Sequence, residues 1–237
     1  MKKYIFLLTI FILTAILSNG NSNPLSSIEG AWVHETGDKK IVILIQDGYF
    51  TKTDYKSDLF ISSWGGLFST QDNQIKVQTE FNSSDSGKVG QEIMMKISLT
   101  NDALNIVIEG ESVQFKRIDE GNAPLAGVWK ITARKQGDKL EPIHQTGSRK
   151  TLKMLTDSRF QWFAIDPKTK IFSGTGGGTY TFINGKYTEN IDFFSRDNKR
   201  VGAGLTFDGK LENGKWHHSG LSSKGDPIYE VWEKSNK

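Results

Sequence analysis

The chain has no cysteine and little proline. Without cysteine in its 237 residues, it cannot form disulfides, thiol nucleophiles, iron–sulfur clusters or cysteine-ligated zinc sites. Five prolines stand against 24 glycines, 14 phenylalanines, six tryptophans and six tyrosines. Aromatic residues favour half-buried strands, and glycine permits the dihedral angles of tight turns. The composition therefore predicts strands joined by tight turns, around a core that needs no disulfide.

A strong charge of one sign and long helical patterns are also missing. The chain has 30 Lys and Arg residues against 27 Asp and Glu, and the two signs are interspersed. A nucleic-acid-binding protein needs basic residues clustered on one face, so we expect no nucleic-acid partner. No segment shows sustained helical periodicity. The best helical candidate, residues 135–148, contains Gly137, Pro142 and Gly147 and is expected to be a loop.

The first twenty residues have the order of a secretory signal peptide. Two lysines precede an apolar run over residues 4–17, and Ser18-Asn19-Gly20 follows it. The run is shorter than the roughly 20 apolar residues of a membrane span, although an uncleaved anchor is the alternative. We expect residues 1–20 to be removed, the protein to be secreted or periplasmic, and no transmembrane segment to remain.

The rest of the chain repeats itself, which is the most informative feature of the sequence. Gly30-Ala31-Trp32 opens one half and Gly127-Val128-Trp129 the other. Five further matches follow in the same order: Gly48-Tyr49-Phe50 with Ser158-Arg159-Phe160, Trp64-Gly65-Gly66-Leu67-Phe68 with Gly176-Gly177-Gly178-Thr179-Tyr180, Thr79-Glu80 with Thr188-Glu189, Lys88-Val89-Gly90 with Arg200-Val201-Gly202, and Gln114-Phe115-Lys116-Arg117 with Val231-Trp232-Glu233-Lys234. Residues 119–124 are polar and read as a linker. We therefore expect two related domains, at residues 21–119 and 124–237.

Each half contains about eight strand-like runs, which is the number that closes a small barrel. The runs of the first half are 31–35, 40–46, 49–53, 59–70, 74–81, 91–99, 104–109 and 112–118. Those of the second half are 127–133, 150–155, 159–165, 171–182, 186–194, 202–207, 214–218 and 228–234. Turn signals such as Asn184-Gly185, Asp208-Gly209 and Asn213-Gly214 separate them. We expect an all-β fold of two tandem antiparallel eight-stranded barrels, with a sandwich as the alternative.

Both halves resemble lipocalin and calycin barrels, through an opening Gly-x-Trp, a strand meander and a basic residue on the last strand. In that family the tryptophan plugs one end of the barrel and the late basic residue packs over it. The resemblance implies such a contact for Trp32 with Arg117, and a weaker one for Trp129 with Lys234, because lysine lacks a planar guanidinium. These contacts are expected to be structural.

The second half also resembles uncharacterised bacterial secreted lipocalin-like domains. The segments that carry this likeness are Phe160-Gln161-Trp162, 174–180, Tyr187-Thr188-Glu189, Arg200-Val201-Gly202 and Tyr229-Glu230-Val231-Trp232. The likeness implies a fold and an exported location but no activity. The first half departs from it, because Trp64 replaces one glycine of the run and Gln114 is matched to Glu230. A site shared by the two halves is therefore expected to be lost from the first.

Two motifs are better explained by structure than by cofactors. The glycine run 174–178 lacks the Lys-Ser/Thr of a phosphate-binding loop and continues as a strand, so it indicates a bend or a close backbone approach. His217 and His218 are adjacent in a strand and point to opposite faces, so they cannot hold one metal ion together. We expect no cofactor and no metal site.

Strand parity places two carboxylates inside the second barrel. Tyr187, Glu189, Ile191 and Phe193 share the more apolar face of their strand, and Glu230 shares a face with Trp232. We expect Glu189, Glu230 and His218 in the lumen, lined by Trp162, Tyr180 and Tyr187. Aromatic walls with a few polar groups are typical of a ligand pocket, whereas the alternative is a self-satisfied polar network that fixes the strand register.

Three functions follow from this interpretation. The first is an exported protein that binds a small amphipathic or sugar-like ligand in the second barrel. The second is a non-catalytic module of the cell envelope with filled barrels. The third is a carbohydrate-active hydrolase or lyase that uses Glu189 and Glu230 as paired carboxylates. We lean against an enzyme, and the oligomeric state is left open.

Overall fold

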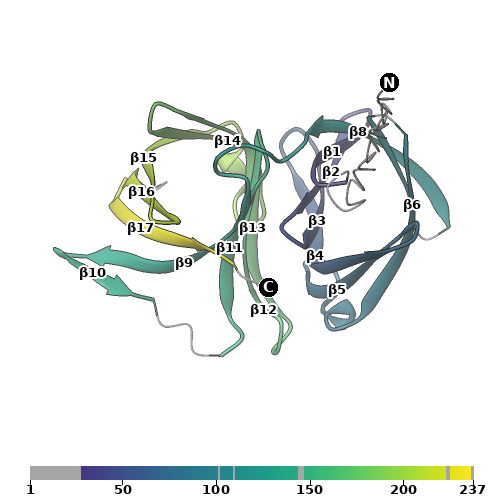
Figure 1. The fold of residues 1–237 in the computed structure, drawn as a ribbon, viewed down its shortest axis with the longest axis horizontal. Coiled ribbons are helices and arrows are strands. Elements are labelled where there is room, and N and C mark those ends of the chain that lie inside the picture. The colour runs from purple at the N-terminus through teal and green to yellow at the C-terminus, as the bar shows by residue number, and fades with distance from the viewer. Residues whose placement is uncertain (1–27, 101, 109, 144–146, 223–224, 236–237) are drawn as a thin grey trace, which may run out of the picture.

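The structure is a computed structural model, which describes residues 28–100, 102–108, 110–143, 147–222 and 225–235. The predicted signal peptide at residues 1–20 lies outside them. The described residues form two closed eight-stranded antiparallel barrels in tandem, side by side along the long axis of the molecule (Figure 1). The predicted fold class and internal duplication are confirmed.

The first barrel is a simple meander in which each strand pairs with the next and the last closes on the first. Its strands are β1 (Gly30–Thr36), β2 (Lys39–Gln46), β3 (Tyr49–Tyr55), β4 (Phe60–Gln71), β5 (Gln74–Asn82), β6 (Glu92–Thr100), β7 (Ala103–Ile108) and β8 (Glu111–Asp119). The short helix η1 (Ser86–Lys88) joins β5 to β6.

The second barrel repeats this meander and adds one strand. Its strands are β9 (Gly127–Gln136), β10 (Lys139–Pro142), β11 (Lys150–Leu155), β12 (Arg159–Asp166), β13 (Ile171–Ile183), β14 (Lys186–Phe194), β15 (Gly204–Glu212), β16 (Lys215–Leu221) and β17 (Pro227–Lys234). Helix η2 (Asn198–Arg200) joins β14 to β15, and pairing of β9 with β17 closes the barrel.

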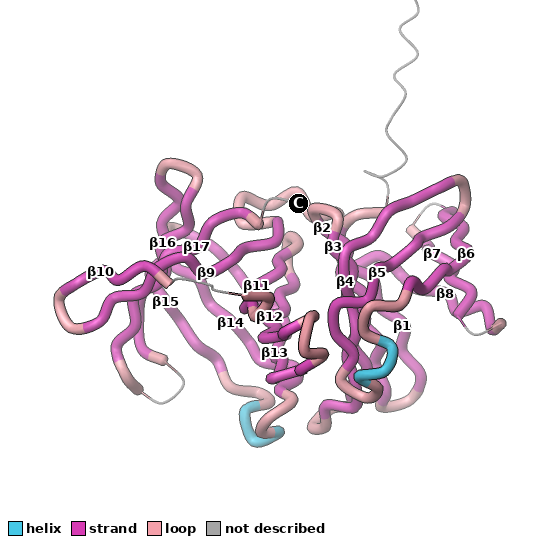
Figure 2. The backbone as a smooth tube through the Cα atoms, turned by 90° about the horizontal axis from the view of Figure 1, so that it is seen from below, coloured by secondary structure: helices cyan, strands magenta, loops and turns pink. Residues whose placement is uncertain are grey.

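The extra strand corrects the expectation of a loop over residues 135–148. Strand β9 runs on to Gln136, turns at Gly137 with a positive φ of 58°, and pairs with β10 as a hairpin. Glycine at that turn supports the hairpin because a positive φ costs it nothing. This hairpin projects from the second barrel on the side away from the first (Figures 1 and 2).

A second correction concerns Asp208-Gly209, which the sequence predicts to be a turn. These residues lie inside β15, and the turn falls at Asn213-Gly214, where φ is 51° and 74°. Gly209 instead leaves room for neighbouring side chains, since a Cβ there would lie 2.8 Å from Cε2 of Phe182 and 3.4 Å from Nε1 of Trp216. Glycine in a strand thus marks a close approach of side chains.

The two barrels share one strand register. Trp32 pairs with Ile43 in the first and Trp129 with Lys153 in the second. A bulge follows Gly65 in β4 and Gly177 in β13.

The shared register shows that two of the expected matches are wrong. Val77 lies opposite Phe68 as Glu189 lies opposite Tyr180, so Val77 occupies the place that Thr79-Glu80 was expected to share with Thr188-Glu189. On the last strand Val113, not Gln114, takes the place of Glu230, because Val113 pairs with Ile106 as Glu230 pairs with His218.

The barrel ends are closed by the two expected contacts. The Arg117 guanidinium lies 4.0 Å from the Trp32 ring centre, and the Lys234 ammonium lies 4.8 Å from that of Trp129. Each indole N–H donates to a carbonyl four residues earlier, that of Ile28 at 2.9 Å and that of Leu125 at 2.8 Å. Both indoles are therefore buried with their polar atoms satisfied.

The barrels pack against each other through the outer faces of β2–β5 and β11–β14. Tyr49 and Phe81 of the first barrel stack on Phe163 of the second, with ring centres 5.2 and 5.1 Å apart. Val42, Leu44, Leu152, Met154 and Ile165 extend this shared apolar cluster. Strands β3 and β11 are consequently covered on both faces, and this apolar cluster joins the two barrels, each of which keeps an interior core of its own.

Polar groups within this interface are paired in a repeated pattern. Glu80 accepts from Tyr49 of its own barrel at 2.7 Å and from Lys150 of the other at 2.8 Å. Asp192, the counterpart of Glu80, accepts from Arg159 of its own barrel and from Tyr55 of the other. Each carboxylate thus joins both barrels.

We expect the two barrels to unfold together. Phe163→Ala removes a fully buried ring from the shared apolar cluster and should lower the free energy of unfolding by about 3–5 kcal/mol. The exposed control Ile171→Ala should cost about 0.5 kcal/mol or less. Chemical denaturation followed by tryptophan fluorescence and circular dichroism measures both. Two separate transitions in the unmutated protein would contradict the expectation.

Candidate functional site

The second barrel contains a cavity of about 370 Å³, whose lining includes Ile131 and Arg134 of β9. Its volume lies within the roughly 300–1,000 Å³ usual for small-molecule pockets. Of the residues predicted for the site, four line it: Trp162, Glu189, His218 and Glu230. The apolar walls include Phe194, Phe207 and Trp232.

Glu189 lies deep in the barrel and is ion-paired. Its Oε1 accepts from Nζ of Lys153 at 2.7 Å and from the hydroxyl of Tyr187 at 2.8 Å. Both charged side chains are nearly enclosed, with 8% of Lys153 and 6% of Glu189 exposed. Burial, and then the Glu189 carboxylate, raise the pKa of Tyr187 well above its ordinary value, so Tyr187 stays a donor. Tyr187 lies behind Glu189 and outside the cavity wall.

Lys153 is surrounded by aromatic rings. Its ammonium nitrogen lies 5.3 Å from the ring centre of Tyr187, 5.5 Å from those of Trp216 and Trp232, and 5.7 Å from that of Phe160. The negative faces of these rings attract a cation when water is excluded. The rings and Glu189 together therefore compensate for the loss of water around the buried ammonium group.

Glu230 forms a second ion pair nearer the mouth. Its Oε1 accepts from Arg134 at 2.7 Å and its Oε2 from the indole of Trp232 at 3.2 Å. Burial alone would raise the pKa of Glu230, but His218, Lys153 and Arg134 outweigh it and hold that pKa at about 2. Glu230 is therefore ionised at neutral pH, with Arg134 half exposed at the cavity edge.

His218 is enclosed between aromatic rings and is 3% exposed. Its ring centre lies 4.2 Å from that of Phe207 and 5.2 Å from that of Trp216. Among the described residues, neither ring nitrogen has a hydrogen-bonding partner. Nδ1 lies 3.6 Å from Oε2 of Glu230, which is too far for a hydrogen bond. Burial lowers the pKa of His218, so its imidazole is neutral at pH 7.

The glycine run lets aromatic side chains reach the cavity wall. Gly176 has no side chain, and a Cβ there would lie 2.7 Å from Nε1 of Trp162 and 2.8 Å from Cδ2 of Phe194. The two rings meet edge to face at 5.4 Å, and the Arg196 guanidinium covers the Trp162 ring. The run therefore marks a close backbone approach within β13, as expected from its lack of a phosphate-loop pattern.

The same positions carry only apolar side chains in the first barrel. In the shared register Lys153, Tyr187, Glu189, Trp216, His218 and Glu230 correspond to Ile43, Ile75, Val77, Leu104, Ile106 and Val113. All six apolar residues belong to the core of the first barrel. The fold thus forms with an apolar interior, and the polar interior of the second barrel is not a requirement of the fold.

Sequence reasoning missed some residues of the site and included two, Tyr180 and Tyr187, that lie outside the cavity lining. It missed Lys153 and Arg134, although a lysine within the apolar run of β11 is a signal that could have been noticed. Tyr180 does not reach the cavity, since its hydroxyl donates to the Thr156 carbonyl at 2.6 Å and its ring packs on Tyr187.

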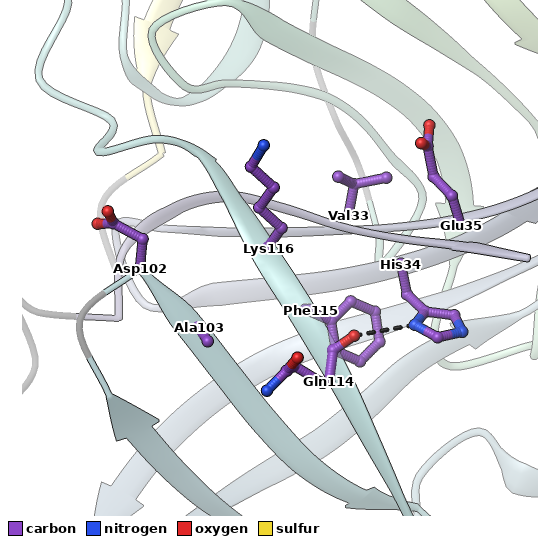
Figure 3. Close-up of a pocket in the computed structure, with 8 residues that line it drawn as sticks. All are labelled: Val33, His34, Glu35, Asp102, Ala103, Gln114, Phe115 and Lys116. Atoms are coloured by element: carbon purple, nitrogen blue, oxygen red, sulfur yellow. Dashed lines mark hydrogen bonds between the residues drawn. The ribbon is translucent and has the colours of Figure 1, made fainter.

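A pocket of similar size, about 390 Å³, lies in the wall of the first barrel between β1 and β7–β8 (Figure 3). His34 crosses it, with Nδ1 2.9 Å from the Gln114 carbonyl and Nε2 2.9 Å from the Thr36 hydroxyl. Because a carbonyl only accepts, Nδ1 carries the proton and Nε2 accepts from Thr36. Both nitrogens are already used, so this pocket is a weaker candidate than the cavity.

Metal and membrane features were sought in the same residues. Within the described ranges, no three His, Asp or Glu side chains lie where they could hold a metal ion together. No helix among the residues that the structure describes has both the length and the apolar character needed to cross a membrane.

Comparison with known proteins identifies no family. No family model matches the chain, and no curated protein does. Among solved structures, the β clamp of Helicobacter pylori bound to a DNA ligase peptide matches 90% of this chain and 60% of its own, at 10% identity and a TM-score of 0.18. This chain therefore spans less than two thirds of that protein's length. A likeness at this score carries no argument about fold or function.

The first barrel supplies the substitutions that test whether the buried ion pair is needed for folding. Lys153→Ile leaves Glu189 buried without its cation and should lower the free energy of unfolding by about 3–5 kcal/mol. Adding Glu189→Val should restore it to about the original value or above, because replacing a whole buried pair by apolar residues is often neutral or stabilising. Urea denaturation measures both variants.

A surface ion pair provides the control for this series. Lys186 and Asp208 are 61% and 67% exposed, so Lys186→Ile should change the free energy of unfolding by about 1 kcal/mol or less. If the Lys153→Ile/Glu189→Val variant were as unstable as Lys153→Ile alone, the ion pair would be part of what builds the barrel.

His218 should make the protein sensitive to mild acid. Because its pKa is lowered from 6.5 in the folded state, the unfolded chain takes up the proton first as the pH falls below about 6.5. Folded stability should therefore decrease from pH 7 towards pH 5, and His218→Ile should remove part of that decrease. Denaturation at several pH values checks this, with His217→Ala as the control for loss of a histidine. An unchanged pH profile in His218→Ile would contradict the assignment.

Proposed function

We propose that the chain is an exported, lipocalin-like binding protein whose second barrel holds a small amphipathic or sugar-like molecule in its lumen. The cavity has aromatic walls and polar groups that converge from β9, β11, β14, β16 and β17. This combination is the usual composition of a small-molecule site. The first barrel, with its apolar interior, then acts as a rigid partner that covers the outer face of β11–β13.

The observation that carries this proposal is the difference between the two interiors. Buried charges are costly, and an apolar pair at the same place is usually at least as stable. The first barrel shows that Ile43 and Val77 fill the positions of Lys153 and Glu189 in the same fold. The polar residues of the second barrel therefore have a use other than fixing the strand register, and ligand recognition is that use.

The carboxylates are less suited to hydrolysis of a glycosidic bond. Such an enzyme needs one carboxyl group that keeps its proton near neutral pH and donates it to the leaving group. With a pKa of about 2, Glu230 does not hold a proton. Glu189 is already paired with Lys153. The arrangement favours binding over general acid catalysis.

Blocking the cavity should abolish binding. Leu205 lines the cavity, and Leu205→Trp should fill part of it. Leu211→Trp places the same side chain farther along β15 at an exposed position outside the lining and serves as the control. Small aromatic amphiphiles and methyl glycosides, titrated to ~1 mM and followed by tryptophan fluorescence, are the probes. The proposal fails if no probe binds the unmutated protein, or if Leu205→Trp binds as the control does.

A further inference from the structure

The charge balance of the cavity limits what it can hold. Each carboxylate in the wall already has a cation: Lys153 for Glu189 and Arg134 for Glu230. A ligand with a net charge would either remain unpaired in an enclosed site or displace one of these partners, and both are costly. The cavity therefore favours an uncharged molecule.

One deep acceptor remains open to the cavity. Both hydrogen bonds of Glu189 end on Oε1, whereas Oε2 meets no hydrogen-bonding partner among the described residues and is not fully enclosed. The oxygens of Glu230 receive Arg134 and Trp232, and the nitrogens of His218 are enclosed, so Oε2 of Glu189 is the open atom among the carboxylates and imidazole that line the cavity. An ionised carboxylate oxygen only accepts, so its complement is a hydroxyl or an N–H group.

The walls around this acceptor are apolar and aromatic. Trp162, Phe194, Phe207 and Trp232 present rings to the cavity, together with branched aliphatic side chains such as Ile191. A sugar carries several hydroxyl groups, most of which would lose their hydrogen bonds with water there, whereas a flat apolar body would bury its surface against the rings.

We propose that the second barrel selects a flat, uncharged molecule with one hydrogen-bond donor, which enters donor first and bonds to Oε2 of Glu189. This inference rests on the proposed function and narrows its ligand class to donor-bearing aromatic amphiphiles. It excludes sugars, carboxylates and ammonium compounds as preferred ligands of this site.

A naphthalene series tests the inference with shape held nearly constant. The probes are 2-naphthol, 2-methoxynaphthalene, naphthalene-2-carboxylate, 2-naphthylmethylammonium and, as the sugar, methyl β-glucoside. At neutral pH 2-naphthol should bind roughly tenfold or more tightly than 2-methoxynaphthalene, because a hydrogen bond to a charged acceptor is lost in the ether. Both charged probes and the glucoside should bind more weakly than 2-naphthol. Isothermal titration calorimetry measures each affinity.

The preference for a donor must depend on Glu189. In the Lys153→Ile/Glu189→Val variant, which copies the first barrel, 2-naphthol and 2-methoxynaphthalene should bind about equally. Circular dichroism establishes that the variant is folded, and Glu189→Gln, which keeps the shape, gives a second measurement and should reduce the preference.

Three outcomes separate this inference from the proposed function. Tightest binding of a charged probe or the glucoside, abolished by Leu205→Trp, would overturn the donor inference and leave the proposed function standing. A preference for 2-naphthol that persists in both Glu189 variants would also overturn it. Failure of all probes to bind would contradict both.

Discussion

Closure of each sheet on itself is the constraint on which the rest of the structure depends. Because successive side chains in a strand point to opposite faces, closure commits every second residue to a small interior. In the first barrel that interior holds Ile43, Ile75 and Ile106 and is built from apolar side chains. In the second barrel the same commitment forces Lys153 and Glu189 together, and their pairing at 2.7 Å makes a charged interior tolerable.

The interface between the barrels adds a second constraint, since it buries the outward face as well. Leu152 and Met154 of β11 lie against the first barrel while Lys153, between them, points into the second. The strand is therefore apolar on its outer side and charged on its inner side, the reverse of an ordinary barrel strand exposed to water. The outer apolar face contributes the burial that the inner face lacks, so the first barrel helps to stabilise the wall that carries the site.

This reversal explains why the sequence predicted some residues of the interior and not others. The duplication, the turn glycines and the opening tryptophans predicted the barrels. Parity placed Glu189 inside, because strand β14 keeps one exposed face and shows clean alternation. Glu230 was placed inside through the face that it shares with Trp232, since burial along β17 does not alternate in this way. Parity could not reveal Lys153, because β11 is buried on both faces and shows no alternation. The matching of Thr79-Glu80 with Thr188-Glu189 failed for a related reason: identical letters were aligned, whereas the bulges after Gly65 and Gly177 set the true register. Tyr180 shares the inward parity, but its depth in the barrel, which parity does not report, removes it from the cavity.

Because the chain is duplicated, its two barrels can be compared with each other. Two barrels with one register and one connection order differ in their interiors at six matched positions, so the difference cannot be assigned to the demands of the fold. His218 is the sharpest instance, because a neutral imidazole with two enclosed, unpartnered nitrogens is less favourable than the isoleucine that its counterpart Ile106 provides. Costly buried polar groups beside a cavity are the arrangement expected where stability has been given up for recognition, and Glu189, with its open oxygen, is the group through which we propose that recognition acts.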